Sequence, residues 1–133
     1  MEFEYKIQSI PNNITKVEKI CAEVCKKANF DEDSCDDFAI AATEAANNAI
    51  IHGNKSNPAK NITLTFKVYE NEVTLKISDE GEGFEIKELR DPLAPENVFA
   101  ENGRGILIIK ALVDKVFYEF DKNCTSIVLF KKA

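Results

Sequence analysis

The sequence has no tryptophan, one methionine, one histidine and no long apolar run. A membrane-spanning helix needs about 20 consecutive, mostly apolar residues. Residues 1–8 alternate charged and apolar side chains, whereas a secretion signal has a basic stretch followed by an apolar one. We therefore expect a cytoplasmic protein without a membrane segment.

The four cysteines, Cys21, Cys25, Cys35 and Cys124, contain no C-x-x-C pair. With His52 as the single histidine, this spacing argues against a zinc site. Cys21 and Cys25 lie four residues apart on a predicted helix, and we interpret them as small buried thiols in a reducing compartment.

Basic residues are fewer than acidic ones: the sequence has 17 Lys and Arg and 23 Asp and Glu, which gives a net charge of -6. Binding to a phosphate backbone requires clustered positive charge, so nucleic acid is not expected as a direct partner. The length of 133 residues, with 44% hydrophobic and 30% charged residues, predicts one globular domain over residues 1–133.

Hydrophobic periodicity predicts the order of the secondary structure. The first half of the chain is expected to form a strand at 2–8, a helix at 14–28 and a second helix that begins at a cap within 31–34 and runs to about 52. The second half is expected to form a strand hairpin at 62–68 and 73–77, a buried helix at 105–113 and a final hairpin at 116–120 and 126–130. Gly53 is expected to end the second helix in a left-handed conformation. This order predicts an α+β, two-layer sandwich with helices on one face of a mostly antiparallel sheet.

Glu44 and Asn48 form the first candidate site because they lie four residues apart on a helix that otherwise carries mostly small apolar residues. Side chains at this spacing emerge on the same stripe of a helix. An amide oxygen beside a nucleotide is a suitable ligand for Mg²⁺, which would leave the carboxylate free to act as a base. Taken alone, the pair is equally compatible with a solvated polar face.

Asp79 directly follows a predicted strand and opens a loop that contains Gly81 and Gly83. A carboxylate in this place can accept a hydrogen bond from the amino group of a base, and the glycines let the backbone pass close to a flat ring. An ordinary acidic turn is the simpler alternative. A calcium loop is rejected, because the third and fifth positions, which should carry oxygen ligands, are the two glycines.

Gly103, Arg104 and Gly105 precede an apolar helix. Backbone N–H groups at such a helix start can face phosphate oxygens, and the arginine can add positive charge. The complete P-loop and dinucleotide-binding motifs are absent. The long stretch between the second and third blocks shows no periodicity, and loops of this length are usually functional.

Taken in order, the three blocks resemble the motifs of the GHKL ATPases, which have the Bergerat fold, and the likeness is closest to the small anti-sigma-factor serine kinases. The family's E-x-x-x-N-A-x-x-H-G, D-x-G-x-G and G-x-G-[LI] blocks are matched by Glu44, Asn48, Ala49, His52 and Gly53, then by Asp79, Gly81 and Gly83, then by Gly103, Gly105 and Ile106. The family's N-G-T before the last strand reads Asn123-Cys124-Thr125 here, with a cysteine in place of the glycine.

The resemblance implies a role for each matched residue. Asn48 would hold Mg²⁺, Glu44 would be the catalytic base that activates a hydroxyl, and Asp79 would contact the adenine amino group. The remaining ATP-binding positions would be Gly81, Gly83, Gly103, Arg104, Gly105 and Thr125. Residues 85–102 would form a lid over the phosphates, and His52 would end its helix structurally.

The implied activity is that of a serine/threonine-protein kinase that uses ATP and Mg²⁺. Its substrate would be an anti-sigma-factor antagonist protein, a sigma factor would be the second partner, and a homodimer would fit the family. Three alternatives remain: a non-catalytic ATP-binding switch, the ATPase half of a histidine kinase that works in trans, and a plain α/β protein without nucleotide.

Overall fold

The computed structural model describes residues 1–80, 103–121 and 124–133. In chain order these residues form β1 (Glu2–Gln8), a 3-10 turn η1 (Pro11–Asn13), α1 (Ile14–Lys27), α2 (Glu32–Asn48), a π-helical turn η2 (Ala49–Gly53), β2 (Asn61–Tyr69), β3 (Glu72–Ser78), α3 (Gly103–Leu112), β4 (Lys115–Asp121) and β5 (Cys124–Lys132). The predicted order of strands and helices is therefore confirmed.

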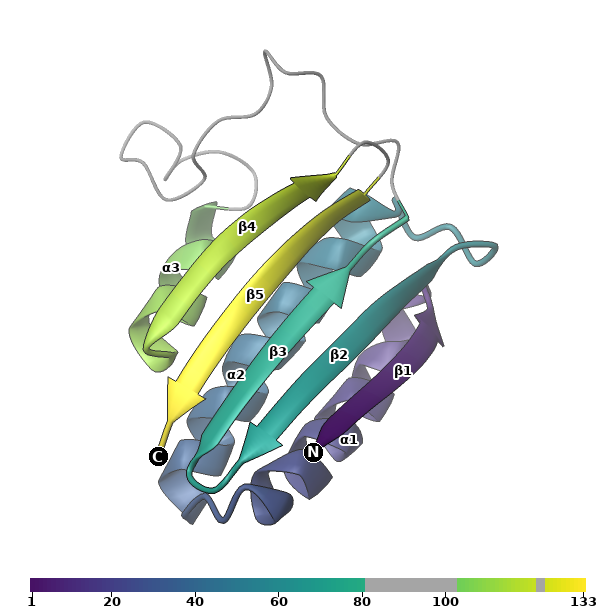
Figure 1. The fold of residues 1–133 in the computed structure, drawn as a ribbon. Coiled ribbons are helices and arrows are strands. Elements are labelled where there is room, and N and C mark those ends of the chain that lie inside the picture. Colours follow the sequence, from purple (N-terminus) through teal and green to yellow (C-terminus); the bar gives the residue numbers. More distant parts are fainter. Residues whose placement is uncertain (81–102, 122–123) are drawn as a thin grey trace.

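The five strands form one sheet in the order β1-β2-β3-β5-β4, and each pair of neighbours is antiparallel. The three α-helices lie on one face of this sheet, with α2 between α1 and α3 (Figure 1). The predicted two-layer α+β architecture is confirmed. The last strand in sequence, β5, lies inside the sheet between β3 and β4.

The core lies between the helices and the inner face of the sheet. Strand residues at alternating positions supply one half of it, and α1 and α2 supply the other half. Its largest fully buried side chains are Phe38, Ile50, Ile62, Leu64, Phe66, Leu75, Ile77, Ile109 and Leu129. Cys21 and Cys25 are free thiols that belong to this core, as predicted.

The start of α2 follows its predicted cap, because Asp31 Oδ1 accepts a hydrogen bond of 2.7 Å from the Ser34 N–H. Such a bond satisfies one of the N–H groups that the first turn of a helix leaves without a partner. The end of α2 differs from the prediction, since the α-helix stops at Asn48 and five further residues form the π turn η2.

The helix α3 is only partly buried, which corrects the prediction of a buried helix. Ile109 is buried, whereas Leu107 and Ile108 are 47% and 40% exposed. The reason is that α3 packs chiefly against α2, so only one stripe of its apolar surface is covered.

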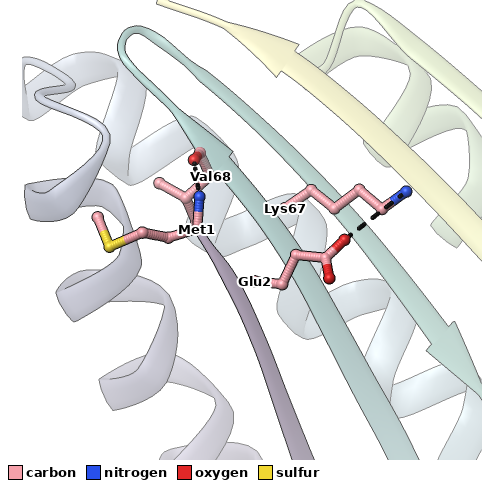
Figure 2. A network of polar contacts seen from close by, with 4 residues as sticks. All are labelled: Met1, Glu2, Lys67 and Val68. Carbon is pink, nitrogen blue, oxygen red and sulfur yellow. Dashed lines mark hydrogen bonds and ion pairs between the residues drawn. The ribbon is translucent and has the colours of Figure 1, made fainter.

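Met1, the residue before the edge strand β1, ties the start of this strand to β2 (Figure 2). The Met1 ammonium group donates a hydrogen bond of 2.9 Å to the Val68 carbonyl, and the Val68 N–H donates one of 2.8 Å to the Met1 carbonyl. Glu2 and Lys67 form an ion pair of 4.0 Å beside them, but both side chains are more than half exposed, so this pair adds little stability. No helix among the described residues is long and apolar enough to cross a membrane.

Candidate functional site

A cavity of about 390 Å³ lies between the end of α2, the turn η2 and one end of the central strands. This volume is within the range of small-molecule sites. The helical side of the lining is Ala45, Asn48, Ala49, Ile51, His52, Gly53 and Lys55, and the sheet side is Ile77, Asp79, Tyr118, Thr125 and Ile127. The structure thus brings Asn48, Asp79 and Thr125 together, three residues that the sequence had assigned to one site.

Asp79 lies immediately after β3 and is 9% exposed. Its N–H donates a hydrogen bond of 3.0 Å to the Thr125 carbonyl, and the Thr125 N–H donates one of 3.1 Å to Asp79 Oδ1. The preceding pair in the ladder is Ser78 opposite Ser126, so Asp79 continues the β3–β5 pairing into the cavity. A carboxylate that accepts a backbone N–H is oriented by that bond.

Gly53 lies directly against the Asp79 carboxylate on the helical side of the cavity. A Cβ atom added at Gly53 would lie 2.2 Å from Asp79 Oδ2 and 2.7 Å from its Cγ. The backbone of Gly53 is not left-handed, so the prediction that it ends the helix in that conformation is wrong. Glycine is needed here because the carboxylate occupies the space that any other side chain would take.

The turn η2 shapes the helical wall of the cavity. The Asn54 N–H donates to the Ala49 carbonyl at 2.8 Å, which is the i to i+5 bond of a π turn. Such turns are rare and occur frequently at functional sites. Here the wider turn carries His52 and Gly53 along the cavity wall. His52, which the sequence assigned to a structural helix end, is therefore also a residue of the site.

Asn48 contributes an amide to the cavity, and its Nδ2 atom is buried without a hydrogen-bond partner among the described residues. A half-turn of the amide exchanges its oxygen and nitrogen, so Asn48 can offer the cavity either an acceptor or two donors. An oxygen in this place suits Mg²⁺, which binds through few protein oxygens and through substrate phosphates. The residue present therefore fits the predicted metal ligand.

Glu44 lies one helical turn before Asn48 and is half-buried, but it does not line the cavity as the described residues enclose it. Its role as a base stays a prediction. In the part of the chain that the structure describes, no group of three or more His, Cys, Asp or Glu side chains could hold a metal ion. Within residues 1–80, 103–121 and 124–133, a Mg²⁺ at Asn48 would therefore not be held by a cluster of such side chains, and substrate phosphates and water would supply ligands beside the amide oxygen.

The sheet side of the cavity is mainly apolar. Ile77 pairs with Ile127 across β3 and β5, and Ile127 pairs with Tyr118 across β5 and β4, so the three side chains form a row. Burial, and secondarily the Asp79 charge, raises the pKa of Tyr118 to about 12, so its phenol stays neutral at physiological pH. The analysis of the sequence missed Tyr118, because only the register of β4 against β5 reveals its place.

The other predicted site residues fall at the limits of the structure. Gly81, Gly83 and the expected lid at 85–102 lie outside the described residues. Gly103, Arg104 and Gly105 form the first turn of α3, but the side chains of this helix are described only from Leu107 onward. Their contact with phosphate stays a prediction.

Comparison with known proteins gives a consistent picture. The family profile described as "Histidine kinase-like ATPase domain" matches residues 7–131. A protein named "Serine-protein kinase RsbW" from Oceanobacillus iheyensis is 28% identical over 119 residues, which are 85% of this chain and 75% of the relative. The protein of the same name from Bacillus licheniformis is 25% identical over 128 residues, which are 92% of this chain and 80% of the relative.

Solved structures show the same fold. The RsbU and RsbW domains of a Mycobacterium tuberculosis protein superpose with a TM-score of 0.71 at 16% identity, over 99% of this chain and 32% of that one. The histidine kinase domain of a blue-light activated histidine kinase from Erythrobacter litoralis superposes with a TM-score of 0.58 at 12% identity, over 95% of this chain and 61% of that one. The present chain thus spans about a third of the Mycobacterium chain and under two thirds of the Erythrobacter chain.

Proposed function

The chain belongs to the histidine kinase-like ATPase domain family, and on this premise we propose that it binds ATP in the cavity beside Asp79 and transfers the γ-phosphoryl group to a serine or threonine hydroxyl of a partner protein. One observation carries the proposal. The Asp79 carboxylate is buried at the cavity wall, oriented by the Thr125 N–H and packed against Gly53. A fixed buried acceptor of this kind selects a ligand with a donor.

The adenine ring would lie against the apolar row on the sheet side, with its amino group toward Asp79. Ile77 and Ile127 supply flat apolar contact there, and the neutral phenol of Tyr118 adds an aromatic edge. A carboxylate has about four lone-pair positions, so the bond from Thr125 leaves capacity for a further donor. This arrangement would favour adenine over guanine, which carries an oxygen in place of the amino group.

Phosphoryl transfer depends mainly on positioning and on stabilisation of charge. In the proposed reaction the hydroxyl oxygen of the partner forms a bond to the γ-phosphorus, the bond from that phosphorus to ADP breaks, and Glu44 takes the hydroxyl proton. Asn48 would hold Mg²⁺, which would supply neutralisation of the phosphate charge. The N–H groups at the start of α3 would bind phosphate oxygens, which helix N-termini favour.

The family resemblance is the basis for the partners that we propose. We propose an anti-sigma-factor antagonist as the phosphorylated protein and a sigma factor as the second partner. The relatives named "Serine-protein kinase RsbW" support a protein substrate.

A non-catalytic ATP-binding switch is the second candidate, and one observation favours it. Glu44 does not line the cavity in the part of the chain that the structure describes. The switch would keep the nucleotide contacts of Asp79 and Asn48 and would transfer nothing. The charge-removing substitution Glu44→Gln separates the two functions, because it abolishes transfer only in a kinase.

Calorimetric titration with ATP and with GTP, each with and without Mg²⁺, tests the proposal. We expect binding that prefers ATP, increases with Mg²⁺ and weakens by about 2 kcal/mol in Asp79→Ala, the scale for a hydrogen bond to a charged group. Glu70→Ala is the matched control, since Glu70 is an exposed acid at the β2–β3 turn. If neither nucleotide binds under any of these conditions, the proposed kinase function is wrong.

A further inference from the structure

Asn54 follows the π turn directly and is buried, with 2% of its surface exposed. Its Nδ2 donates hydrogen bonds of 2.6 Å to Ser9 Oγ and 2.9 Å to the Asn61 carbonyl, and its Oδ1 accepts one of 2.8 Å from the Glu80 N–H. Its own N–H closes the π turn onto Ala49. One side chain thus joins the residue after β1, the start of β2 and the residue after Asp79.

Both N–H donors and the carbonyl oxygen of this amide have a hydrogen-bond partner. The three partners are separated from Asn54 by 45, 7 and 26 residues in the sequence. Buried polar groups that are all paired in this way hold their surroundings in one arrangement. The Asn54 side chain therefore connects the end of the helical layer to the ends of three strands through hydrogen bonds.

Asn54 is connected to the proposed adenine-binding residue Asp79 in two ways. Gly53, the residue before Asn54, packs against the Asp79 carboxylate, and Glu80, the residue after Asp79, is held by Asn54 Oδ1. The Glu80 carboxylate also accepts a hydrogen bond from the Asn61 N–H. The Asn54 amide thus fixes the distance between η2 and the backbone next to Asp79. Asn54 itself does not belong to the cavity lining formed by the described residues.

We propose that Asn54 is a positioning residue for purine recognition: by holding Glu80 against the π turn it sets the place of the Asp79 carboxylate and so the preference for a 6-amino purine. This inference rests on the proposed binding of ATP through Asp79. A purely structural role predicts something different, namely an equal loss of affinity for every nucleotide.

The test is the ratio of the dissociation constants of ITP and ATP, since ITP carries an oxygen in place of the 6-amino group. Any uniform change in affinity cancels in this ratio. We expect the parent protein to prefer ATP by about tenfold or more, as one hydrogen bond to a charged group allows. Asn54→Ala should reduce that preference to about threefold or less, because the Glu80 N–H next to Asp79 loses its partner on the π turn.

Two control variants keep the Glu80 contact. Ser9→Ala removes one buried partner of Asn54 without touching Glu80, and Asn54→Asp retains an oxygen that can accept the Glu80 N–H. Both should keep the parent ratio. In the Asp79→Ala background the ratio should no longer respond to Asn54→Ala, because the two residues act through one contact.

Circular dichroism establishes first that each variant is folded. A folded Asn54→Ala protein with the parent ratio overturns the inference, and so does a ratio that Ser9→Ala lowers equally. If Asn54→Ala does not fold, Asn54→Ser takes its place, with a side chain one bond shorter, and the same two results decide. If Asp79→Ala leaves the ratio unchanged, the assignment of adenine to Asp79 fails instead.

Discussion

Replacement of Gly53 by alanine is the sharpest test of how the site is built. The added Cβ would lie 2.2 Å from Asp79 Oδ2, 2.7 Å from Cγ and 2.9 Å from Cβ. Rotation of the carboxylate can relieve the first of these contacts. The last one involves an atom fixed to the backbone of Asp79, so the whole residue has to move. The bond of 3.1 Å from the Thr125 N–H to Oδ1 would then be strained or lost.

The expected magnitudes differ for stability and for binding. Overpacking costs about 1–3 kcal/mol, whereas a glycine-to-alanine change at a compatible backbone position stabilises by about 0.4–1 kcal/mol through the unfolded chain. The unfolding free energy should therefore fall by only about 1 kcal/mol. Loss of the oriented carboxylate should weaken ATP binding by about 2 kcal/mol, which is roughly 30-fold.

Urea unfolding and ATP calorimetry on Gly53→Ala measure the two quantities separately. The double variant Gly53→Ala/Asp79→Ala is the matched control, because truncation of Asp79 removes the atoms that collide with the new methyl group. Its stability should exceed the value expected if the two single effects were additive. ATP affinity of Gly53→Ala within about threefold of the parent, which is less than 1 kcal/mol, would refute the reasoning.

Three further predictions concern other groups. Asn48→Ala should remove the Mg²⁺ dependence of ATP binding, and an affinity that still rises with Mg²⁺ in calorimetry would contradict the assignment. Glu44→Gln should abolish phosphorylation of the partner, measured with radiolabelled ATP, while the dissociation constant for ATP stays unchanged; equal loss of both would place Glu44 in binding. Burial, with a smaller effect of Glu18, raises the pKa of Cys21 from 9.0 to about 12. Its protonated thiol therefore stabilises the fold below about pH 9, and this contribution is lost as the pH rises toward 12. The urea midpoint should fall more steeply over that interval in the parent than in Cys21→Ala, and parallel curves would show that Cys21 does not titrate with folding.

Alternating apolar residues were sufficient to predict β1, β2 and β3, because the inner face of a sheet with one covered side imposes a period of two. β5 was predicted from a continuous apolar run instead, and five of its consecutive residues are buried. The bounds of β1 at Glu2–Gln8 match the prediction fully. The π turn was not predictable, since Ala49, Ile50 and Ile51 continue a helical pattern and the shift to an i+5 bond leaves no mark in it. The burial of α3 was overestimated for a related reason: a run of apolar residues does not reveal that, among the described elements, α3 packs chiefly against α2.

The sequence predicts those cavity residues that belong to a sequence motif. It does not predict those that reach the cavity only through the pairing of strands or through contacts between distant segments. Asn48, Asp79 and Thr125 were assigned from their blocks, and the structure places all three on one cavity. Gly53 was identified as important for a reason that the structure corrects, because its neighbour Asp79 lies 26 residues later in the chain. Tyr118 carries no local signal and enters only through its pairing with Ile127.

The position of β5 between β3 and β4 has a consequence for synthesis of the protein (Figure 1). While a ribosome has not yet made Cys124–Lys132, β3 has no partner on that side, β4 has no neighbour, and Thr125 cannot hold Asp79. The nascent chain therefore exposes two unpaired strand edges, which are prone to associate with other chains. If the proposed function is right, nucleotide binding through Asp79 has to wait until this strand has emerged from the ribosome, because Thr125 orients the Asp79 carboxylate.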